Sequence, residues 1–417
     1  MKADGSKRPV IVLCPHYAPD TAPTGVVMTR IVDELVRLGH RVHVVTSLPW
    51  YRRHRVEDGW TGRVWRKETT SWGSVVRVSP FAGRDKANVP RRALGFAAFS
   101  LLIGLRGLFV GGVHRRARAV VAMSPPLTLG LTGWVVAKVR RAPLVFNVQD
   151  VFPDAAISTG KLSNRRIIAL AGWLERLSYR RSDAVVVLSD DLRDNVAAKM
   201  PAKHAGKAVV IPNFVDSDVI VPRSTDTAYR REFAPAADRV VMYAGNVGFS
   251  QSLDLLVDAA RRMADVTFVV NGEGSSRADL EARAAGVANI VFVDYQPADR
   301  LAEVLASADV HVVPLRRGLG NVSVPSKAYS IMAAARPIVA SIDADSEVAR
   351  MIGAARCGAV VPPEDVDALV ASLRSLLDAP AEREVMGARG RAWVVEHASP
   401  ARVGESYALL IERLANR

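Results

Sequence analysis

The stretch 240-VVMYAGNVGFSQSLDLL-256 combines a short apolar run, a loop that contains glycine and the start of a helical pattern. The run VVMYAG (240–245) has the length and the β-branched content of a buried strand. Five further runs of this kind follow, each after a helical pattern: VTFVVN (266–271), NIVFVD (289–294), DVHVVP (309–314), PIVAS (337–341) and GAVV (358–361). Continuous apolar strands that alternate with helices predict a parallel sheet covered on both faces.

The first half of the chain shows the same alternation. Its expected strands are PVIVLC (9–14), VHVVTS (42–47), VVRVS (75–79), AVVAM (119–123), PLVFNV (143–148), AVVVLS (184–189) and AVVIP (208–212). The segment 24–40 predicts the first helix, and a charged stretch around 217–238 separates the two halves. The fold class is therefore α/β, with one doubly wound domain over residues 1–216 and a second over 217–397. In the last segment Val403, Tyr407, Leu410, Ile411 and Leu414 share one helical face.

The net charge of +14 over 417 residues is unevenly distributed. Residues 1–216 contain 34 Lys and Arg against 16 Asp and Glu, whereas the remainder contains 22 against 26. The first half is therefore expected to meet an anionic partner, either nucleic acid, acidic lipid or a phosphorylated acceptor. An aromatic content of 6% and the lack of a known binding module argue against nucleic acid.

The cysteine count and the N-terminal residues bear on localisation. The two cysteines, Cys14 and Cys357, lie in different halves and suggest neither a disulfide framework nor a cysteine metal site. The N-terminal apolar run is too short for a signal peptide and is broken by Pro15. We expect a cytoplasmic protein.

Three loops that follow expected strands in the second half are candidates for a ligand site. Gly245 precedes a helix start, where backbone N–H groups can approach a phosphate; the alternative is a tight turn that needs glycine. The loop with Gly272, Glu273 and Gly274 either receives a nucleoside or is a flexible turn. The backbone around Tyr295 either contacts a base or forms a structural turn.

A fourth loop, 316-RRGLGNVSVPSKAYSIMAAARP-337, begins with two arginines and has no Asp, Glu or His between Gly320 and Arg336. Pro325 favours a helix start, and Ser323 or Ser326 can cap that helix. Lys327 then lies in the first turn, where a cation opposes the helix dipole unless an anion is near. The alternative is a solvated lysine beside an ordinary cap.

In the first half, two loops place polar or small residues at the carboxyl ends of strands. The loop 15–25 ends in Gly25 at a helix start, and FNVQDVFPDA places Gln149 and Asp150 after a buried strand. Ligands of doubly wound sheets bind at this edge. The alternative for Asp150 is a cap of the next segment.

The segment 91-RRALGFAAFSLLIGLRGLFVGGVHRRAR-118 has a different character. Residues 93–113 are almost entirely apolar, whereas Arg106 and five glycines argue against a spanning helix. A helix at an anionic membrane interface fits better; the alternative is a helix partly buried in the first domain. The expected membrane contacts are Arg91, Arg92, Leu102, Phe109, Arg115 and Arg116.

These pieces together resemble the family-4 retaining glycosyltransferases of the GT-B fold over nearly the whole chain. The marks are GHRVHVVTS (39–47), IPNFVDSDVIVP (211–222), YAGNVG, NGEG, VFVDYQPADRL and SADVHVVPL. FNVQDVFPDA, YAGNVGFSQSLD and GLGNVSVPSKAYSIMAAARPIVASIDADSEVA look like the fucosaminyltransferase and colanic-acid transferase subgroup, which builds bacterial surface polysaccharides on lipid carriers. The resemblance implies two Rossmann-like domains facing across a cleft, the first binding the acceptor and the second the nucleotide-sugar. It also implies that residues 398–417 cross back to complete the first domain.

The sequence departs from the wider family at the positions that bind the donor. Asn246 and Gln251 stand where the family has an Arg and a Lys, Val322 and Ser330 stand where it has two Glu, and Gln149 replaces a His. The resemblance then implies that Lys327, with Arg316 or Arg317, bears the charge of the diphosphate. The donor residues it implies are Gly245, Asn246, Gln251, Gly272, Glu273, Gly274, Tyr295, Arg316, Gly320, Asn321, Val322, Ser323, Ser326 and Ser330.

The resemblance further implies a mechanism without a carboxylate nucleophile, in which the β-phosphate of the donor accepts the proton of the acceptor hydroxyl. Lys327 would stabilise the leaving diphosphate, while Asp150 would orient the acceptor or assist proton transfer on the acceptor side, beside Gly25 and Gln149. Asp343 and Asp345 match a metal motif in letters only, so no metal and no cofactor are expected. The expected partners are a nucleotide-sugar, with UDP favoured, a polyprenyl-diphosphate-linked saccharide and the anionic inner leaflet of the plasma membrane.

Three other functions are compatible with the sequence. A GT-B sugar-nucleotide epimerase or phosphorylase shares the fold, but an epimerase would offer more ionisable groups in its cleft. An inactive transferase-like partner would explain the replaced donor residues. A basic nucleic-acid-binding protein would explain the charge.

Overall fold

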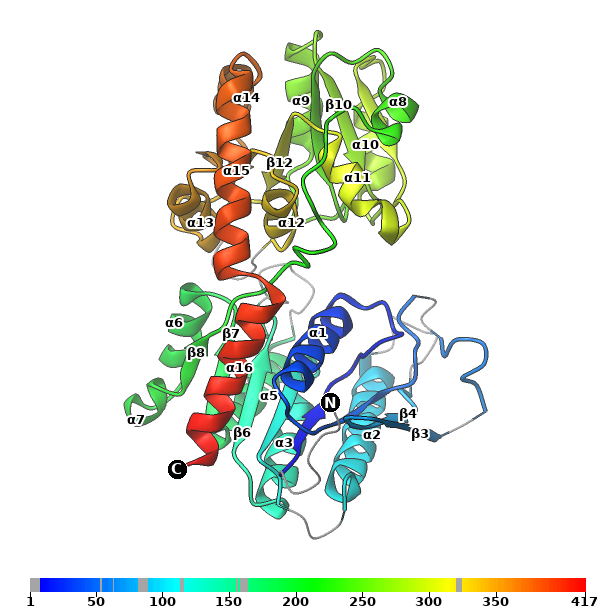
Figure 1. Ribbon diagram of the computed structural model, residues 1–417, viewed down its shortest axis with the longest axis vertical. Helices are drawn as coiled ribbons and strands as arrows, with labels where there is room; N and C mark the ends of the chain where they lie inside the picture. Colours follow the sequence, from blue (N-terminus) through cyan, green and yellow to red (C-terminus); the bar gives the residue numbers. More distant parts are fainter. Residues whose placement is uncertain are drawn as a thin grey trace. The chain divides into compact units, whose positions relative to one another are not determined.

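The computed structural model describes residues 8–52, 55–62, 64–81, 89–112, 116–154, 157, 164–319 and 325–417, with the backbone alone for residues 89–93. The chain forms two compact units (Figure 1). Unit 1 comprises Met1–Asn213 and Pro400–Arg417, and unit 2 comprises Phe214–Ser399.

Unit 1 is built on a sheet in which neighbouring strands are parallel except for one edge hairpin. Its strands are β1 (Val10–Leu13), β2 (Val42–Ser47), β3 (Trp65–Thr70), β4 (Gly73–Val78), β5 (Ala119–Ser124), β6 (Leu144–Val148), β7 (Ala184–Val187) and β8 (Ala208–Val210). They lie in the order β3-β4-β2-β1-β5-β6-β7-β8. The direction of winding reverses between β1 and β5, which is the topological switch point of this sheet.

Strand β3 is absent from the sequence-based expectation. Its residues WRKETT are polar except for Trp65 and alternate between exposed and half-buried, and the strand pairs antiparallel with β4 at the edge of the sheet. A charged edge strand discourages pairing with other chains but carries no apolar periodicity. Each strand expected in the first half is otherwise present.

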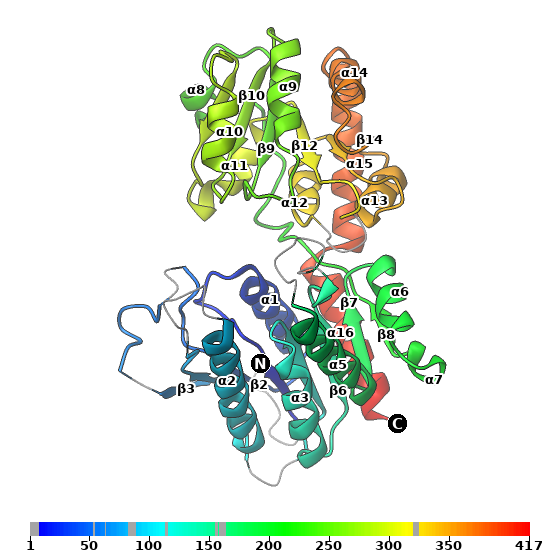
Figure 2. The ribbon, with the colours of Figure 1, turned by 180° about the vertical axis from the view of Figure 1, so that it is seen from behind.

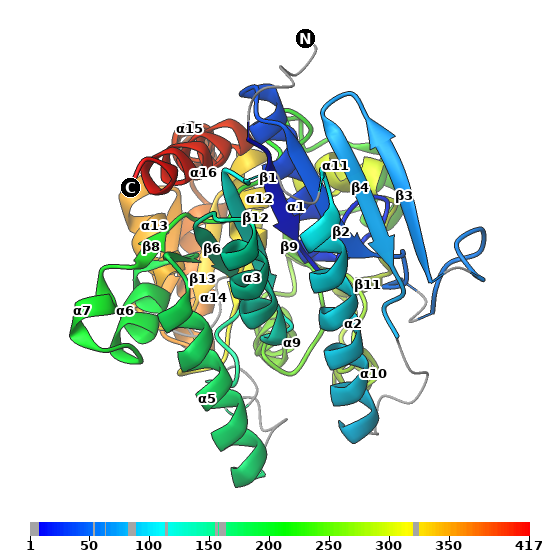
Figure 3. The same ribbon diagram turned by 90° about the horizontal axis from the view of Figure 1, so that it is seen from below.

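Helices cover both faces of this sheet. They are α1 (Pro23–Arg37), α2 (Val89–Phe109), α3 (Thr128–Val139), α5 (Arg165–Arg181), α6 (Asp190–Ala198), α7 (Ala202–Ala205) and α16 (Pro400–Ala415). Helices α2, α3 and α5 form a row on one face, and α1 and α16 lie on the other (Figures 2 and 3).

The C-terminal helix α16 is part of unit 1, as the resemblance implied. The five apolar residues expected on one face, Val403, Tyr407, Leu410, Ile411 and Leu414, are all buried. Asn147 Nδ2 of β6 donates to the Tyr407 hydroxyl over 2.6 Å. At Gly404 an added Cβ would lie 2.3 Å from Glu34 Cβ, so a glycine permits the close contact of α16 with α1.

Unit 2 is a second parallel sheet, and all six expected strands form. They are β9 (Val240–Ala244), β10 (Thr267–Asn271), β11 (Ile290–Val293), β12 (Val310–Pro314), β13 (Ile338–Ser341) and β14 (Gly358–Val361). Their order, β11-β10-β9-β12-β13-β14, is the 3-2-1-4-5-6 order of a Rossmann sheet. The switch point therefore lies between β9 and β12.

Successive residues of β9 point to opposite faces of this sheet, as the strand period requires. Val241 and Tyr243 belong to one core and Met242 to another. The helical elements of the unit are α8 (Ala228–Phe233), α9 (Asp254–Arg262), α10 (Arg277–Arg283), the 3-10 helix η1 (Ala298–Arg300), α11 (Leu301–Ala306), α12 (Lys327–Ala333), α13 (Glu347–Ala355), α14 (Val366–Leu377) and α15 (Pro380–His397).

Candidate functional site

A pocket of about 250 Å³ opens at the carboxyl edge of the unit 2 sheet, at its switch point. Gly245 follows β9, Asn271 ends β10, Tyr295 follows β11, and Lys327 and Ser330 lie on α12. Apolar side chains of η1 and α11 complete the wall. Four of the residues expected at the donor site therefore line one cavity: Gly245, Tyr295, Lys327 and Ser330.

Lys327 is held by a tyrosine that the sequence did not single out. Its Nζ donates to the Tyr243 hydroxyl over 2.5 Å and lies 3.9 Å from the centre of the Tyr243 ring. The Tyr243 hydroxyl donates in turn to the carbonyl of Asn246 over 2.5 Å. An added Cβ at Gly245 would lie 3.0 Å from Lys327 Nζ, so Gly245 leaves room for the amine. The amine is thus fixed beside the loop that follows β9.

This environment changes the proton affinity of Lys327. The residue is partly exposed as a whole, but burial of the amine lowers its pKa to about 7. Burial likewise raises the pKa of Tyr243. Among the described residues no carboxylate pairs with this amine, so its protonation is costly, and a bound anion would remove that cost. The structure therefore holds a buried lysine amine at the edge of this pocket.

The glycines of the neighbouring loop have a structural role. An added Cβ at Gly272 would lie 1.9 Å from the carbonyl oxygen of Gly245, and one at Gly274 would lie 2.2 Å from that of Val247. Both glycines have positive φ, +151° and +157°. Val247 N also donates to the Glu273 carbonyl over 2.8 Å. These glycines pack the loops after β9 and β10 backbone against backbone, while the Glu273 residue is exposed.

Other expected donor residues already have protein partners. Gln251 Oε1 accepts from Gly248 N over 3.2 Å and so stabilises the loop after β9. Arg316 Nε donates to the Phe249 carbonyl over 2.6 Å, and its Nη1 lies 3.4 Å from Glu364 Oε1. Asn246 is exposed and joins the site through its carbonyl.

The start of α12 differs from the expectation in one respect. Helix α12 begins at Lys327, as expected, and Ser326 occupies the cap position, but the Ser326 side chain makes no capping hydrogen bond. Ser326 has helical backbone angles, φ −58° and ψ −21°, rather than the extended conformation that lets a side chain cap. The predicted residues Gly320, Asn321, Val322 and Ser323 lie outside the described residues.

In unit 1, Gln149 is buried at the end of β6, and its Nε2 donates to Asn147 Oδ1 over 2.7 Å. Although Asp150 is exposed as a residue, protein beside its carboxyl raises the pKa by desolvation. Gly25 lets α1 approach the preceding loop, since an added Cβ would lie 2.9 Å from His16 Cβ. The same loop contains a buried His16–Asp20 pair, which the sequence did not indicate.

The residues expected at a membrane differ in their exposure to solvent. Phe109 is half exposed and Arg116 is exposed, but Leu102 packs partly buried against the unit 1 core, because the face of α2 it occupies points toward the sheet. The neighbouring Leu101 is exposed instead. Arg115 and the side chains of Arg91 and Arg92 lie outside the described part of the chain. No helix within the described residues is long and apolar enough to cross a membrane.

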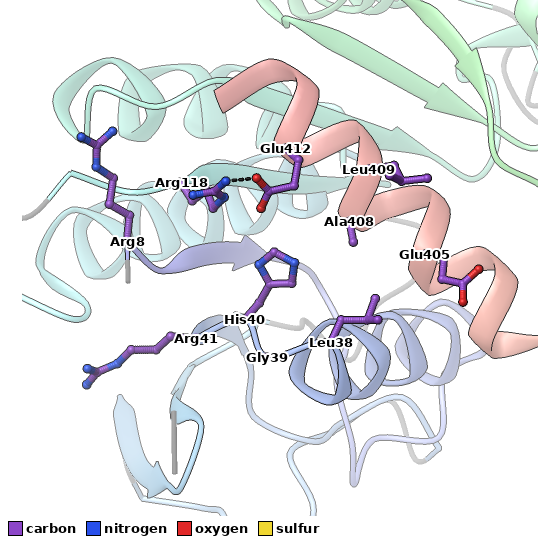
Figure 4. Close-up of a pocket in the computed structure, with 10 residues that line it drawn as sticks. All are labelled: Arg8, Leu38, Gly39, His40, Arg41, Arg118, Glu405, Ala408, Leu409 and Glu412. Carbon is purple, nitrogen blue, oxygen red and sulfur yellow. Dashed lines mark ion pairs between the residues drawn. The ribbon is translucent and has the colours of Figure 1, made fainter. Parts of the chain in front are cut away.

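A larger cavity, of about 610 Å³, lies in unit 1 between the end of α1 and α16 (Figure 4). Arg8, Arg41 and Arg118 each precede a strand there, and Arg118 pairs with Glu412 of α16. This is the amino edge of the sheet, opposite the edge where doubly wound sheets bind ligands. We therefore place the functional site at the carboxyl edges.

Fold and site together define a two-domain α/β protein with two Rossmann-type sheets and a buried lysine amine in a pocket at the switch point of the second. Sequence comparison matches residues 24–213 to a glycosyl transferase 4-like domain and residues 238–379 to glycosyl transferases group 1. The chain therefore belongs to the GT-B glycosyltransferases with a family-4-like first domain and a group 1 second domain.

Individual relatives agree with this assignment. The chain is 26% identical to the putative colanic acid biosynthesis glycosyl transferase WcaI of Escherichia coli K12 over 90% of its own length and 94% of the relative. The fold resembles sucrose-phosphate synthase from Thermosynechococcus elongatus, with a TM-score of 0.72, 16% identity and coverage of 98% and 99% of the two chains. It also resembles Anabaena HepE in complex with UDP, with a TM-score of 0.69, 12% identity and coverage of 97% and 100%.

Proposed function

We propose that this glycosyltransferase moves a hexosyl or N-acetylhexosaminyl unit, with retention and without a metal ion, from a nucleotide-sugar to a lipid-linked saccharide. The place of action would be the inner face of the plasma membrane, in the synthesis of a bacterial surface polysaccharide. The likeness to WcaI supports the polysaccharide, and the HepE complex with UDP supports a UDP-sugar donor.

The observation that carries the donor half of the proposal is the position of Lys327 beside Gly245 and Tyr243 at the unit 2 switch point. In this arrangement a nucleoside diphosphate would place its charge at the amine and its base or ribose in the pocket with Tyr295 and Ser330. Cleavage of the bond between sugar and diphosphate leaves extra negative charge on the diphosphate. A fixed cation stabilises that charge most in the transition state, which accelerates transfer. The same cation supplies the role for which many transferases use a divalent metal.

The donor is identified by a thermal-shift screen of the full chain against UDP, GDP, ADP and dTDP, with and without EDTA. We expect UDP to raise the melting temperature and EDTA to leave that rise unchanged. Stabilisation by a different nucleotide would reassign the donor. A rise that needs added Mg²⁺ or Mn²⁺ would contradict the metal-independent mechanism.

The membrane half of the proposal depends on the outer surface of α2, α3 and α5, three helices that pack side by side. Their exposed apolar side chains include four on α2 at helical spacing, with Leu101 76% exposed. The membrane face is defined by Leu94, Leu101, Leu105, Phe109, Val135, Val139, Ile167, Leu170 and Trp173, all exposed.

The charge of these three helices also suits an anionic bilayer. They contain nine Lys and Arg and one acidic residue, Glu175. Glu175 is buried, and its carboxylate pairs with Lys199 over 2.8 Å. An apolar surface with basic residues and no exposed carboxylate matches the signature of interfacial binding.

The membrane face is tested by flotation with vesicles of phosphatidylcholine, with and without phosphatidylglycerol. We expect wild-type protein to float only with the anionic vesicles and to dissociate at high salt. Leu101→Glu and Leu170→Glu should each weaken binding roughly tenfold or more, because burial of a leucine contributes about 1.5–3 kcal/mol.

Val385→Glu on α15 of unit 2 is the matched control, since Val385 is an apolar residue, 48% exposed, that does not belong to the three helices of the membrane face. Equal losses of vesicle binding in all three variants would show that an added negative charge weakens binding wherever it lies on the protein. Unchanged flotation of both leucine variants would exclude this surface as the membrane contact.

A further inference from the structure

A buried histidine–aspartate pair lies in the loop after β1. His16 Nδ1 is 2.7 Å from Asp20 Oδ2, and the side chain of Asp20 is fully shielded from solvent while that of His16 is 11% exposed. The other carboxylate oxygen of Asp20 accepts from Tyr51 N over 3.2 Å. Asp20 is thus held by the loop after β2 and in turn orients the imidazole.

Two aromatic side chains also hold the imidazole ring in place. It stacks on Trp50 with ring centres 5.5 Å apart and meets Tyr51 edge to face at 5.5 Å. Since the Nδ1 hydrogen is donated to Asp20, the neutral ring has its lone pair on Nε2. Within the part of the chain that the structure describes, Nε2 has no hydrogen-bond partner, and it is not among the fully shielded atoms. The ring therefore presents an accepting nitrogen at the surface.

The position in the fold indicates what this nitrogen meets. His16 follows β1, which pairs with β5 at the switch point, and Gln149 and Asp150 follow β6 on the other side of β5. All lie at the carboxyl edge of the sheet, where ligands of doubly wound domains bind. Unit 1 is the acceptor domain in the proposed function, so His16 lies where an acceptor hydroxyl would be held.

The charged and titratable groups around the loop do not compete for Nε2. Arg77 of β4 donates to the Tyr17 and Ala18 carbonyls and pairs with Glu68 over 3.0 Å. Cys14 precedes the loop, and burial raises the pKa of its thiol to about 12, so it stays protonated near neutral pH. Tyr51 contacts the ring through its aromatic edge. Within the described residues, Asp20 is the hydrogen-bond partner of the His16 ring.

We infer that His16 is a catalytic residue that accepts the proton of the acceptor hydroxyl, with Asp20 as its positioning residue. The inference rests on the proposed function. The acceptor oxygen forms its bond to the anomeric carbon of the donor on the face from which the diphosphate departs, as the proposed retention requires. The bond from that carbon to the nucleoside diphosphate breaks, and the bonding pair leaves with the diphosphate. The hydroxyl proton moves to His16 Nε2, and the imidazolium is stabilised by Asp20 until it releases the proton to solvent. In this scheme the β-phosphate is not the proton acceptor.

The test compares full-length wild type, His16→Gln and Asp20→Asn over a range of pH. Radiolabelled UDP-glucose and UDP-N-acetylglucosamine serve as donors, with a detergent extract of polyprenyl-diphosphate-linked saccharides as acceptor. We expect kcat to fall about 10²- to 10⁴-fold in His16→Gln and the acid limb of its pH profile to disappear. Asp20→Asn should lose a comparable factor because the amide permits the wrong tautomer. The affinity for UDP, measured from the thermal stabilisation that UDP induces, should stay within about twofold of wild type in both variants.

His204→Gln is the control, since His204 lies on α7, away from the carboxyl edge, and should leave kcat and the pH profile unchanged. A pH profile in His16→Gln that keeps the wild-type acid limb would overturn the inference and return the proton to the β-phosphate. The inference would also be overturned if His16→Gln lowered only the thermal stability or the affinity for UDP, because those are the effects expected of a purely structural His16–Asp20 pair.

A second measurement is independent of turnover. Nitrogen chemical shifts of the imidazoles in the unliganded full chain report which ring nitrogen is protonated. A neutral His16 protonated at Nδ1 supports the inference, and one protonated at Nε2 overturns it, because that nitrogen could not accept a proton. If wild type transfers sugar from neither donor, the proposed function fails, while the chemical shifts still decide the state of His16.

Discussion

Lys327→Met is expected to make the ligand-free protein more stable and at the same time to weaken nucleotide binding strongly. The change of the Lys327 pKa from 10.5 to about 7 corresponds to a cost of roughly 5 kcal/mol for holding the charge in the folded protein. Methionine fills a similar volume without charge. Allowing for the lost contacts to Tyr243, we expect a gain of about 2 kcal/mol in the free energy of unfolding at pH 7.

The pH dependence of stability tests separately whether the charge of Lys327 destabilises the folded protein. Below about pH 7 the folded and unfolded forms both hold the Lys327 proton, so the full cost is present. Between pH 7 and 10.5 the unfolded chain holds more protons, and wild-type stability gains from this group as pH rises. Denaturant unfolding across this range should show the advantage of Lys327→Met shrinking toward pH 10.5. A constant or growing advantage would contradict a buried, deprotonated amine.

Nucleotide binding should respond in the opposite direction. Loss of a charge-assisted contact to the diphosphate should cost roughly 3 kcal/mol of binding free energy, and we therefore expect UDP binding to weaken about 100-fold. Arg317→Met is the control, because Arg317 Nη2 donates to the Pro363 carbonyl over 3.2 Å and lies outside the pocket wall. A larger loss in Arg317→Met than in Lys327→Met would place the diphosphate at the arginines.

Gly274→Ala is expected to destabilise unit 2 far more than an ordinary surface substitution. The added Cβ would lie 2.2 Å from the Val247 carbonyl oxygen, at a φ of +157° that side chains rarely adopt. We expect a loss of about 3 kcal/mol, and hence a fall of roughly 6–12 °C in the melting temperature of a unit of this size. UDP binding should fall as well, because the loops after β9 and β10 would separate.

Gly286→Ala provides the matched control for Gly274→Ala. Gly286 also has positive φ, +81°, but no atom lies within 4 Å of an added Cβ. It should therefore show the backbone strain alone, about 1 kcal/mol. Equal losses in the two variants, measured by calorimetry, would mean that the packing of one loop on the other contributes little.

Most strands and helices of both units can be predicted from local patterns in the sequence. A run such as VVMYAG needs burial on both faces wherever it lies, so its identity as a strand does not depend on its neighbours. Strand β3 was missed because a polar edge strand is defined by its partner β4 rather than by its own residues. Likewise, the apolar content of α2 is visible in the sequence, but which of Leu101 and Leu102 faces the core depends on how the helix packs.

The candidate site shows the same division. Lys327 can be selected as a candidate from the sequence because a lysine in a first helical turn without a carboxylate near it in sequence is unusual, which is a local feature. Its partner Tyr243 lies 84 residues earlier and looked like any buried strand residue. The His16–Asp20 pair has helical spacing but lies in a loop, where spacing predicts no contact. The first contact arises only when a helix and a strand that are distant in sequence become neighbours, and the second depends on the fold of its loop.

The return of α16 to unit 1 gives the chain the topology of an insertion. Unit 2 occupies a single continuous segment between two junctions, Asn213–Phe214 and Ser399–Pro400, within the sequence of a host domain. A host domain cut off at the first junction would lack the helix that covers α1 and that supplies the Tyr407 hydroxyl to Asn147. The segment between the junctions contains a whole sheet with its own cores. Recombination at both junctions would therefore exchange unit 2 as a cassette and leave unit 1 with its C-terminal helix.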